Sequence, residues 1–288
     1  MSSRITVRRT PKLFIGGKFP RSESGRTYEV TDRDGTFLAQ AAMASRKDAR
    51  DAVEAARKAQ PGWAGATAYN RGQVLYRAAE LLEGRADQLT EEVAAGEGLE
   101  ADAAAAQVAA AVDRLVWYAG WSDKITVIDG SQNPVAGPYF SFTTPEPTGV
   151  VAAFAPETPS LLGLVSVIAP IIVTGNTVVA VTSFAHPLAA ISLAEILATS
   201  DVPGGVVNLL TGDRDELVPR LASHRDLNAI DLAGFAGADT TEAEQAAADS
   251  MTRVRRPGPV DEDWFAEPDP RRMLAFTEAK TVWHPIGT

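Results

Sequence analysis

The chain has 288 residues, 45% of them hydrophobic, a formal net charge of -10 and no cysteine. This length fits one large domain or two modest ones, and the hydrophobic content is typical of a globular protein. The acidic charge disfavours nucleic acid and anionic membranes as partners, and the lack of cysteine excludes disulfides, thiolate metal sites and a thiol nucleophile.

The sequence indicates neither a secretory signal nor a membrane span. Arg4, Arg8 and Arg9 stand near the N-terminus without an apolar segment behind them. The longest apolar run, 161–173, contains glycine, serine and proline and is shorter than the roughly 20 residues that a membrane helix needs. We therefore expect a cytoplasmic protein.

Up to about residue 120 the pattern predicts helices. Ser45 and Asp48 form a capping box ahead of alanines and a valine at helical spacing, and Pro61-Gly62 is expected to end that helix. A second helix is expected from about Asn70 to Gly84. An alanine-rich stretch at about 99–118 predicts a third helix, because alanine is the best helix former.

The next segment is rich in turn-forming residues. Asp129-Gly130 and Gly137-Pro138 flank candidate strands, and aromatic residues alternate with polar ones from Tyr139 to Thr143. This pattern predicts a β-hairpin or a pair of extended arms within about 124–146.

A regular α/β rhythm follows. Short apolar runs alternate with helical stretches, which predicts a parallel sheet with both faces covered and ligands at the carboxyl ends of its strands. The expected strands are 149–155, 177–181, 206–210 and 229–232. The fold class is therefore α/β with a Rossmann-like parallel sheet.

The composition changes again near Met251. Arg253, Arg255 and Arg256 lie in a stretch with proline, glycine and acidic residues, so 251–270 is interpreted as a linker. The arginines either grip carboxylates of a partner or belong to a solvated linker. The last segment, 271–288, is expected to form a C-terminal arm, and 1–250 is expected to form one domain.

Several motifs, in this order and spacing, resemble the cofactor domain of the aldehyde dehydrogenase superfamily. The central ones are Ala169-Pro170, Gly175-Asn176-Thr177-Val178-Val179, Leu193-Ala194-Glu195 and the segment 203–212, PGGVVNLLTG. Weaker matches are 15–17, 117–120, 145–151 and 224–230. The resemblance covers most of 13–237. It implies that 1–250 is a degenerate cofactor-binding domain of this type, with the hairpin and the C-terminal arm as oligomerisation arms.

Three departures from the family pattern fall on its functional segments. Pro156-Glu157-Thr158 stands where the family has Pro-Trp-Asn, whose asparagine amide serves the oxyanion site, so that amide is gone and a carboxylate has arrived where negative charge would develop. The segment 181–184, VTSF, stands where Lys-Pro-Ser-Glu holds the adenosine ribose. The segment 232–235, LAGF, replaces Phe-Thr-Gly-Ser, and Phe235 is expected to crowd the pyrophosphate turn.

The family's catalytic domain, with its glutamate base and cysteine nucleophile, has no counterpart. After Gly237 the chain passes through the expected linker to 276–282, which resembles the family's C-terminal arm. Family members oxidise aldehydes by thiolate attack and hydride transfer to NAD(P). The departures therefore predict no catalytic residue, and no cofactor or at most weak NAD(P) binding. The degenerate cofactor positions are Glu157, Thr158, Val181, Phe184, Gly234 and Phe235.

Individual polar residues leave alternatives open. Glu157 is either a general acid or base in a remodelled pocket or a solvated residue in a vacant site. Asp231 binds a ligand hydroxyl or serves a turn or cap. Gly234 and Gly237 are weak evidence for phosphate binding. No metal site is expected, because nothing near the three histidines has metal-ligand spacing; they are His186, His224 and His284.

Three functions are consistent with this pattern. The first is a non-catalytic pseudoenzyme subunit that assembles with itself or with a full-length aldehyde dehydrogenase through the arms 124–146 and 274–283. The second is an NAD(P)-dependent oxidoreductase acting on aldehydes, and the third is a nucleotide or small-molecule sensor. Without a catalytic domain, part of the helix face formed by Leu161, Leu164, Val167 and Ile171 is also expected to need a new cover.

Overall fold

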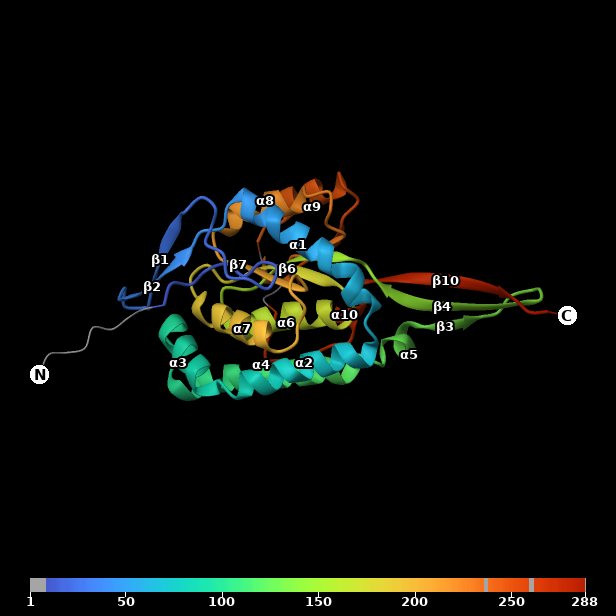
Figure 1. Cartoon of the computed structure of the whole chain (residues 1–288), viewed down its shortest axis with the longest axis horizontal. Coiled ribbons are helices and arrows are strands. Elements are labelled where there is room, and N and C mark those ends of the chain that lie inside the picture. The colour runs from blue at the N-terminus through green and yellow to red at the C-terminus, as the bar shows by residue number, and fades with distance from the viewer. Residues whose placement is uncertain (1–8, 236–237, 259–261, 288) are drawn as a thin grey trace, which may run out of the picture.

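A parallel sheet of five strands, ordered β7-β6-β5-β8-β9, forms the centre of the protein in a computed structural model (Figure 1). The structure describes residues 9–235, 238–258 and 262–287. Arg4, Arg8, Gly237 and the part 259–261 of the expected linker lie outside the described residues.

Four of these strands confirm the predicted alternation of apolar strands and helices. They are completely buried and run parallel, because helices cover both faces of the sheet. Their bounds are β5 (Val150–Phe154), β6 (Thr177–Val181), β7 (Val207–Leu210) and β8 (Ala229–Asp231).

The fifth strand corrects the linker interpretation of the arginine-rich segment. Strand β9 (Arg253–Arg255) pairs in parallel with β8 at the edge of the sheet. Its charged side chains are tolerated there because they find partners: Arg253 donates to the carbonyl of Thr277 at 2.7 Å, and Arg255 donates to Asp231 at 3.1 Å.

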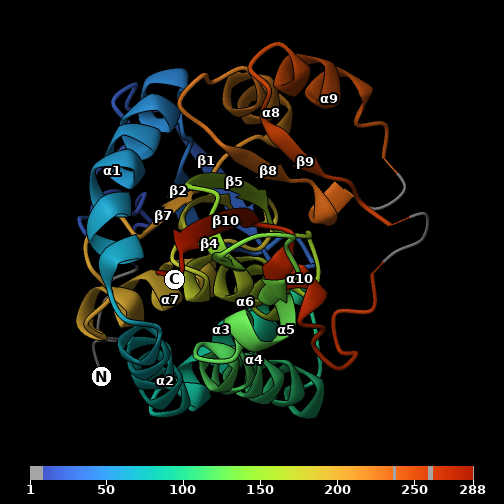
Figure 2. The same cartoon turned by 90° about the vertical axis from the view of Figure 1, so that its right-hand side faces the viewer.

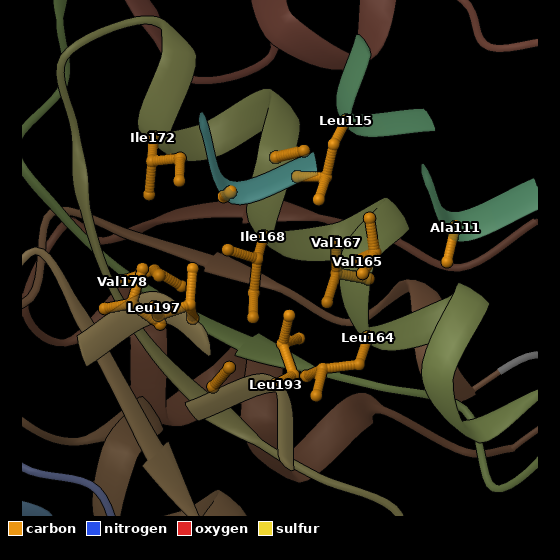
Figure 3. Packing of buried hydrophobic residues seen from close by; sticks show 14 of the residues in the cluster. Ala111, Leu115, Leu164, Val165, Val167, Ile168, Ile172, Val178, Leu193 and Leu197 are labelled. Atoms are coloured by element: carbon orange, nitrogen blue, oxygen red, sulfur yellow. The ribbon is translucent and has the colours of Figure 1, made fainter. Parts of the chain in front are cut away.

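Two layers of helices cover one face of the sheet (Figure 1). The inner layer is α6 (Ser160–Val173) and α7 (Leu188–Thr199). The outer layer is α2 (Ala68–Glu83), α3 (Ala86–Glu97) and α4 (Ala101–Trp121). Figure 3 shows the core between them, where Ile168 and Leu164 of α6 face Leu193 of α7.

Helix α6 is buried on every side, which corrects the expectation of an uncovered face. Leu161, Leu164, Val167 and Ile171 have no exposed surface, because the outer helices and the segment around α10 (Arg271–Leu274) pack over them. At 14 residues α6 is also too short to cross a bilayer. Nowhere in the described ranges is a helix both long enough and apolar enough for that role.

The opposite face carries α1 (Arg46–Gly65), α8 (Arg214–Ala222) and α9 (Thr241–Ala248), which form a second core with the sheet. The predicted capping box of α1 is confirmed, with both Ser45 and Asp48 bonded. The predicted end at Pro61-Gly62 is wrong. Both residues are exposed, and the helix continues because Trp63 is buried and donates from Nε1 to the carbonyl of Ile172 at 2.8 Å.

Other parts of the N-terminal region, which was expected to be mostly helical, contain elements that were not predicted. Helix α3 was not predicted because its apolar stripe is short, with only Leu89, Val93 and Gly96 buried. Before α1 the chain forms an antiparallel pair, β1 (Thr27–Thr31) and β2 (Phe37–Ala42), joined by a turn that contains Gly35 at φ +80°. A short helix, α5 (Ile125–Asp129), follows α4, and a single 3₁₀ turn, η1 (Ala233–Phe235), follows β8.

The predicted hairpin is confirmed and extended by the C-terminal segment. Strands β3 (Ser131–Asn133), β4 (Tyr139–Pro147) and β10 (Thr277–Pro285) form an antiparallel sheet in the order β10-β4-β3. This arm projects from one end of the molecule (Figures 1 and 2). Its base is fixed by Asn176, which accepts from the amide of Gly149 and donates to the carbonyl of Phe276.

Candidate functional site

The carboxyl ends of β5 and β8 meet at one edge of the central sheet, where sheets of this type bind ligands. A cavity of about 400 Å³ lies there. It is lined by Pro156, Glu157, Thr158, Pro159, Arg214, Ala233, Gly234, Glu262, Asp263, Trp264 and Phe265. Three of the predicted site residues, Glu157, Thr158 and Gly234, are therefore brought together.

Both carboxylate oxygens of Glu157 have partners. Oε1 lies 3.1 Å from Nε of Arg214, and Oε2 accepts from the hydroxyl of Ser183 at 2.7 Å and the amide of Ala185 at 3.1 Å. The side chain is 42% exposed. Glu157 thus links the end of β5 to the segment after β6 while part of its side chain stays in contact with solvent.

Arg214 spans the gap between the ends of β5 and β8. Its guanidinium donates to the carbonyls of Ala155 and Gly234, and it lies 5.1 Å from the centre of the Phe235 ring. The side chain is only 14% exposed. Burial lowers the pKa of Arg214, and the charge of Glu157 opposes that effect. An arginine nevertheless keeps its positive charge in such a setting.

Sequence reasoning missed Arg214, although a signal was available. Asp213 caps α8 directly after β7, accepting from the amide of Asp215 at 2.8 Å. A helix that begins just beyond a parallel strand starts at the carboxyl edge of the sheet. An arginine at its first position is therefore close to any site at that edge.

Gly234 and Phe235 shape the same edge through packing. A Cβ on Gly234 would lie 2.3 Å from the carbonyl oxygen of Phe154, so only glycine fits against β5. Phe235 packs edge-on against Phe154 with ring centres 5.2 Å apart. It also lines a second cavity of about 270 Å³ between α8 and α9.

The two predicted positions at and just after the end of β6, Val181 and Phe184, lie in different surroundings. Val181 is fully buried in the core beneath α1 and α8. Phe184 stacks on Tyr28 of β1, with ring centres 4.4 Å apart and planes 11° from parallel. Burial raises the pKa of Tyr28, with a smaller contribution from Glu157. Neither Val181 nor Phe184 lines the 400 Å³ cavity.

A buried ionic cluster lies beside the cavity and involves Asp231. Oδ1 of Asp231 accepts from the amide of Ala233 at 2.9 Å and from Arg255 at 3.1 Å, and Oδ2 lies 3.5 Å from Arg272. Asp231 therefore serves the turn after β8 and two ion pairs. Burial acts to lower the pKa of Arg255, but the charges of Asp231 and Glu262 raise it overall.

This cluster also fixes the segment that begins at Glu262. Arg272 pairs with Glu262 and lies 4.9 Å from the ring centre of Trp264, whose carbonyl accepts from Arg114 at 2.7 Å. Residues 262–274 are thereby held against α4 and the end of the sheet.

The three histidines lie in separate parts of the fold. His186 precedes α7, His224 follows α8 and His284 is on β10. Within the residues that the structure describes, no group of three histidine or carboxylate side chains is placed to hold a metal ion.

The comparison with known families matches this α/β arrangement. A family model described as "Aldehyde dehydrogenase family" matches residues 19–255. This chain belongs to the aldehyde dehydrogenase family. The matched range ends at the last residue of β9, so it contains the whole parallel sheet of this family member.

Individual relatives are longer than this aldehyde dehydrogenase family member. The cytosolic 10-formyltetrahydrofolate dehydrogenase of Pongo abelii is 35% identical over 244 residues, which cover 81% of this chain but 26% of the relative. A putative aldehyde dehydrogenase from Burkholderia cenocepacia superposes with a TM-score of 0.81 at 28% identity, covering 85% of this chain and 50% of that one. The NAD+ complex of an aldehyde dehydrogenase from Bacillus cereus superposes with a TM-score of 0.79 at 28% identity. The match covers 85% of this chain and 50% of that one.

The family motifs can now be related to the geometry of the site. The motif comparison aligns Thr158 with the family's oxyanion asparagine and Glu157 with the tryptophan before it, and in this chain Glu157 is ion-paired with Arg214. It aligns Phe235 with a small residue near the pyrophosphate, and here the ring lies beside Arg214 and between α8 and α9. Glu157 and Phe235 therefore share Arg214 as a partner.

Proposed function

We propose that this chain is a non-catalytic subunit of the aldehyde dehydrogenase family, which assembles with itself or with a full-length aldehyde dehydrogenase. The observation that carries the proposal is the Glu157–Arg214 pair, which lines the cavity at the carboxyl edge of the sheet with an ion pair where the family motif has an amide. The lack of any cysteine supports it, because the family's chemistry begins with a thiolate.

The proposal includes weak or absent NAD(P) binding. The Bacillus cereus relative was solved with NAD+. In this chain the ribose-holding cation and carboxylate of the family motif are replaced by Val181 and Phe184. Losing hydrogen bonds to charged groups weakens binding by about 1.5–3 kcal/mol each, so two losses correspond to more than about a hundredfold.

Turnover and binding assays test these statements separately. The purified chain should produce no NADH from a panel of aldehydes at high protein concentration, and a rate above that of buffer that persists through further purification would contradict the proposal. Calorimetric titration with NAD+ and NADP+ should give no micromolar dissociation constant.

One alternative function is favoured by a specific observation. The cavities of about 400 and 270 Å³ at the carboxyl edge leave space for a small ligand. Micromolar binding of a nucleotide without turnover would therefore support the sensor function. It would contradict the proposal that the chain is a non-catalytic subunit that does not bind a cofactor.

Assembly is proposed through the arm. Strands β4 and β10 pair with each other along nine residues, so the arm's free edges are the outer sides of β10 and β3 within the described residues. An open strand edge favours pairing with another chain. Tyr139, Phe140 and Trp283 are exposed on the arm, the last at 58%. Burial of these aromatic rings against a second subunit would stabilise the assembly.

The assembly test uses substitutions in place of truncation. Truncation before Leu274 would also remove Phe276, which is fully buried in the core. Replacing Tyr139 and Trp283 with serine should convert an oligomer to a monomer in sedimentation analysis, or prevent copurification with a full-length relative. The same change at Tyr69 and Tyr76, exposed on α2, serves as the control. A wild-type chain that is monomeric at micromolar concentration and never copurifies with a relative would refute assembly.

We also propose a cytoplasmic location. The relative from Pongo abelii is named cytosolic, and the described helices include none that could span a membrane. Fractionation of the native cells with an antibody against this chain would test the proposal, and recovery in a membrane or extracellular fraction would reject it.

A further inference from the structure

A cavity of about 750 Å³ lies between α1 and α8, on the face of the sheet opposite α6 and α7. Figures 1 and 2 show these two helices side by side on that face. The cavity shares no lining residue with the site at the carboxyl edge. Its walls are the first turns of α1, the end of α8 and the following loop 223–226.

Basic side chains dominate these walls. They are Arg46, Lys47, Arg50, Arg220, His224 and Arg225. Lys47 pairs with Asp51 at 2.7 Å, and Arg50 lies 3.6 Å from both Asp51 and Glu54. Among the described residues, no carboxylate forms an ion pair with the other three arginines. A protein of net charge -10 thus gathers three unpaired guanidinium groups around one cavity.

The carboxylates in the same walls already have partners. Glu23 accepts from the hydroxyl of Ser45 at 3.1 Å, and Asp226 pairs with Arg57 at 2.8 Å. The amides of the first turn of α1 are also engaged, because the Ser45 side chain accepts from those of Lys47 and Asp48. A ligand in the cavity would therefore be bound by the three arginines rather than by the end of the helix.

The ligand's chemistry follows from these groups. Guanidinium groups bind phosphate oxygens in a planar, two-pronged geometry. Their charges repel one another until an anion lies between them. The cavity has the volume of a small-molecule site, but among the described residues no phenylalanine, tyrosine or tryptophan lines it to stack on a nucleobase. We infer that this cavity binds a compact soluble polyanion that carries two or more phosphate groups.

Calorimetry with inorganic tripolyphosphate tests the inference directly on the full chain. The wild-type chain should bind with a dissociation constant below about 1 mM in moderate salt, and orthophosphate should bind more than about tenfold more weakly. The variant Arg46→Gln, Arg220→Gln, Arg225→Gln should weaken tripolyphosphate binding by at least about tenfold. All three positions are exposed, so the variant should unfold at the wild-type temperature without ligand.

A charge-matched control distinguishes binding in this cavity from non-specific electrostatic attraction of the anion to the protein surface. The variant Lys18→Gln, Lys58→Gln, Arg77→Gln removes the same charge from exposed positions outside the cavity and should bind like the wild type. Equal weakening in both triple variants would overturn the inference, as would orthophosphate binding as tight as tripolyphosphate binding. No binding to the wild-type chain would overturn it as well. None of these outcomes depends on whether the chain is a non-catalytic subunit.

Discussion

Replacing Arg214 with methionine removes the charged group that joins the ends of β5 and β8 while keeping most of its apolar stem. The variant loses hydrogen bonds to the carbonyls of Ala155 and Gly234. Two such bonds from a charged donor contribute about 3 kcal/mol at the lower end of their range. The ion pair with the 42%-exposed Glu157 adds at most about 1 kcal/mol, and the lost desolvation of the guanidinium offsets part of the sum.

We expect the free energy of unfolding to fall by about 2–4 kcal/mol, and the unfolding temperature by roughly 4–8 °C at about 2 °C per kcal/mol for a chain of this size. Urea denaturation followed by circular dichroism measures this difference. Glu157→Gln, which retains an acceptor for Ser183, should lose no more than about 1 kcal/mol. Arg220→Met on the exposed side of the same helix should change stability by less than about 0.5 kcal/mol.

The reasoning is refuted if Arg214→Met is as stable as Arg220→Met, because the guanidinium would then not be holding the two strand ends together. It is also refuted if Glu157→Gln destabilises the chain as much as Arg214→Met does. In that case the exposed ion pair would dominate over the bonds to the carbonyls.

Three further substitutions probe the same edge of the sheet. Asp231→Ala should lower the free energy of unfolding by about 3–5 kcal/mol in denaturant titrations, because it leaves Arg255 and the buried Arg272 without their shared carboxylate; a loss below that of a surface substitution would contradict the buried ion pairs. Gly234→Ala should be destabilising by about 1–3 kcal/mol, since its Cβ would lie 2.3 Å from a backbone oxygen; a neutral effect in thermal unfolding would show that β5 and η1 are not in contact. Burial raises the pKa of Tyr118 from 10.0 to about 12, so the unfolded chain loses this proton first and stability should fall as pH rises from about 10 to about 12. Tyr118→Phe should make that decline less steep and leave stability near neutral pH almost unchanged, because this hydroxyl has no hydrogen-bond partner among the described residues; equal slopes for both proteins would contradict the buried phenol.

The sequence determined the elements whose signals are local. The four apolar strands β5 to β8 were predictable because a buried parallel strand is apolar at nearly every position. The capping box at Ser45 and the hairpin at 139–143 follow from side-chain bonding and turn residues within a few positions. The motif series around Gly175 and Pro203 indicated the family, and the comparisons confirmed it.

Only the tertiary structure decided features that depend on distant partners. Strand β9 is rich in arginine, and it pairs into the sheet because Asp231 and the carbonyl of Thr277 receive its side chains. Helix α1 passes through Pro61 because Trp63 is bonded to α6.

The candidate site shows the same division. Glu157, Thr158 and Gly234 were identified from motif positions, and they do line one cavity. Arg214 was not identified, because its role depends on carbonyls 20 and 59 positions away in the chain. Side-chain chemistry can be inferred from the sequence, but the partner of a long charged side chain is set by how the strands and helices pack in three dimensions.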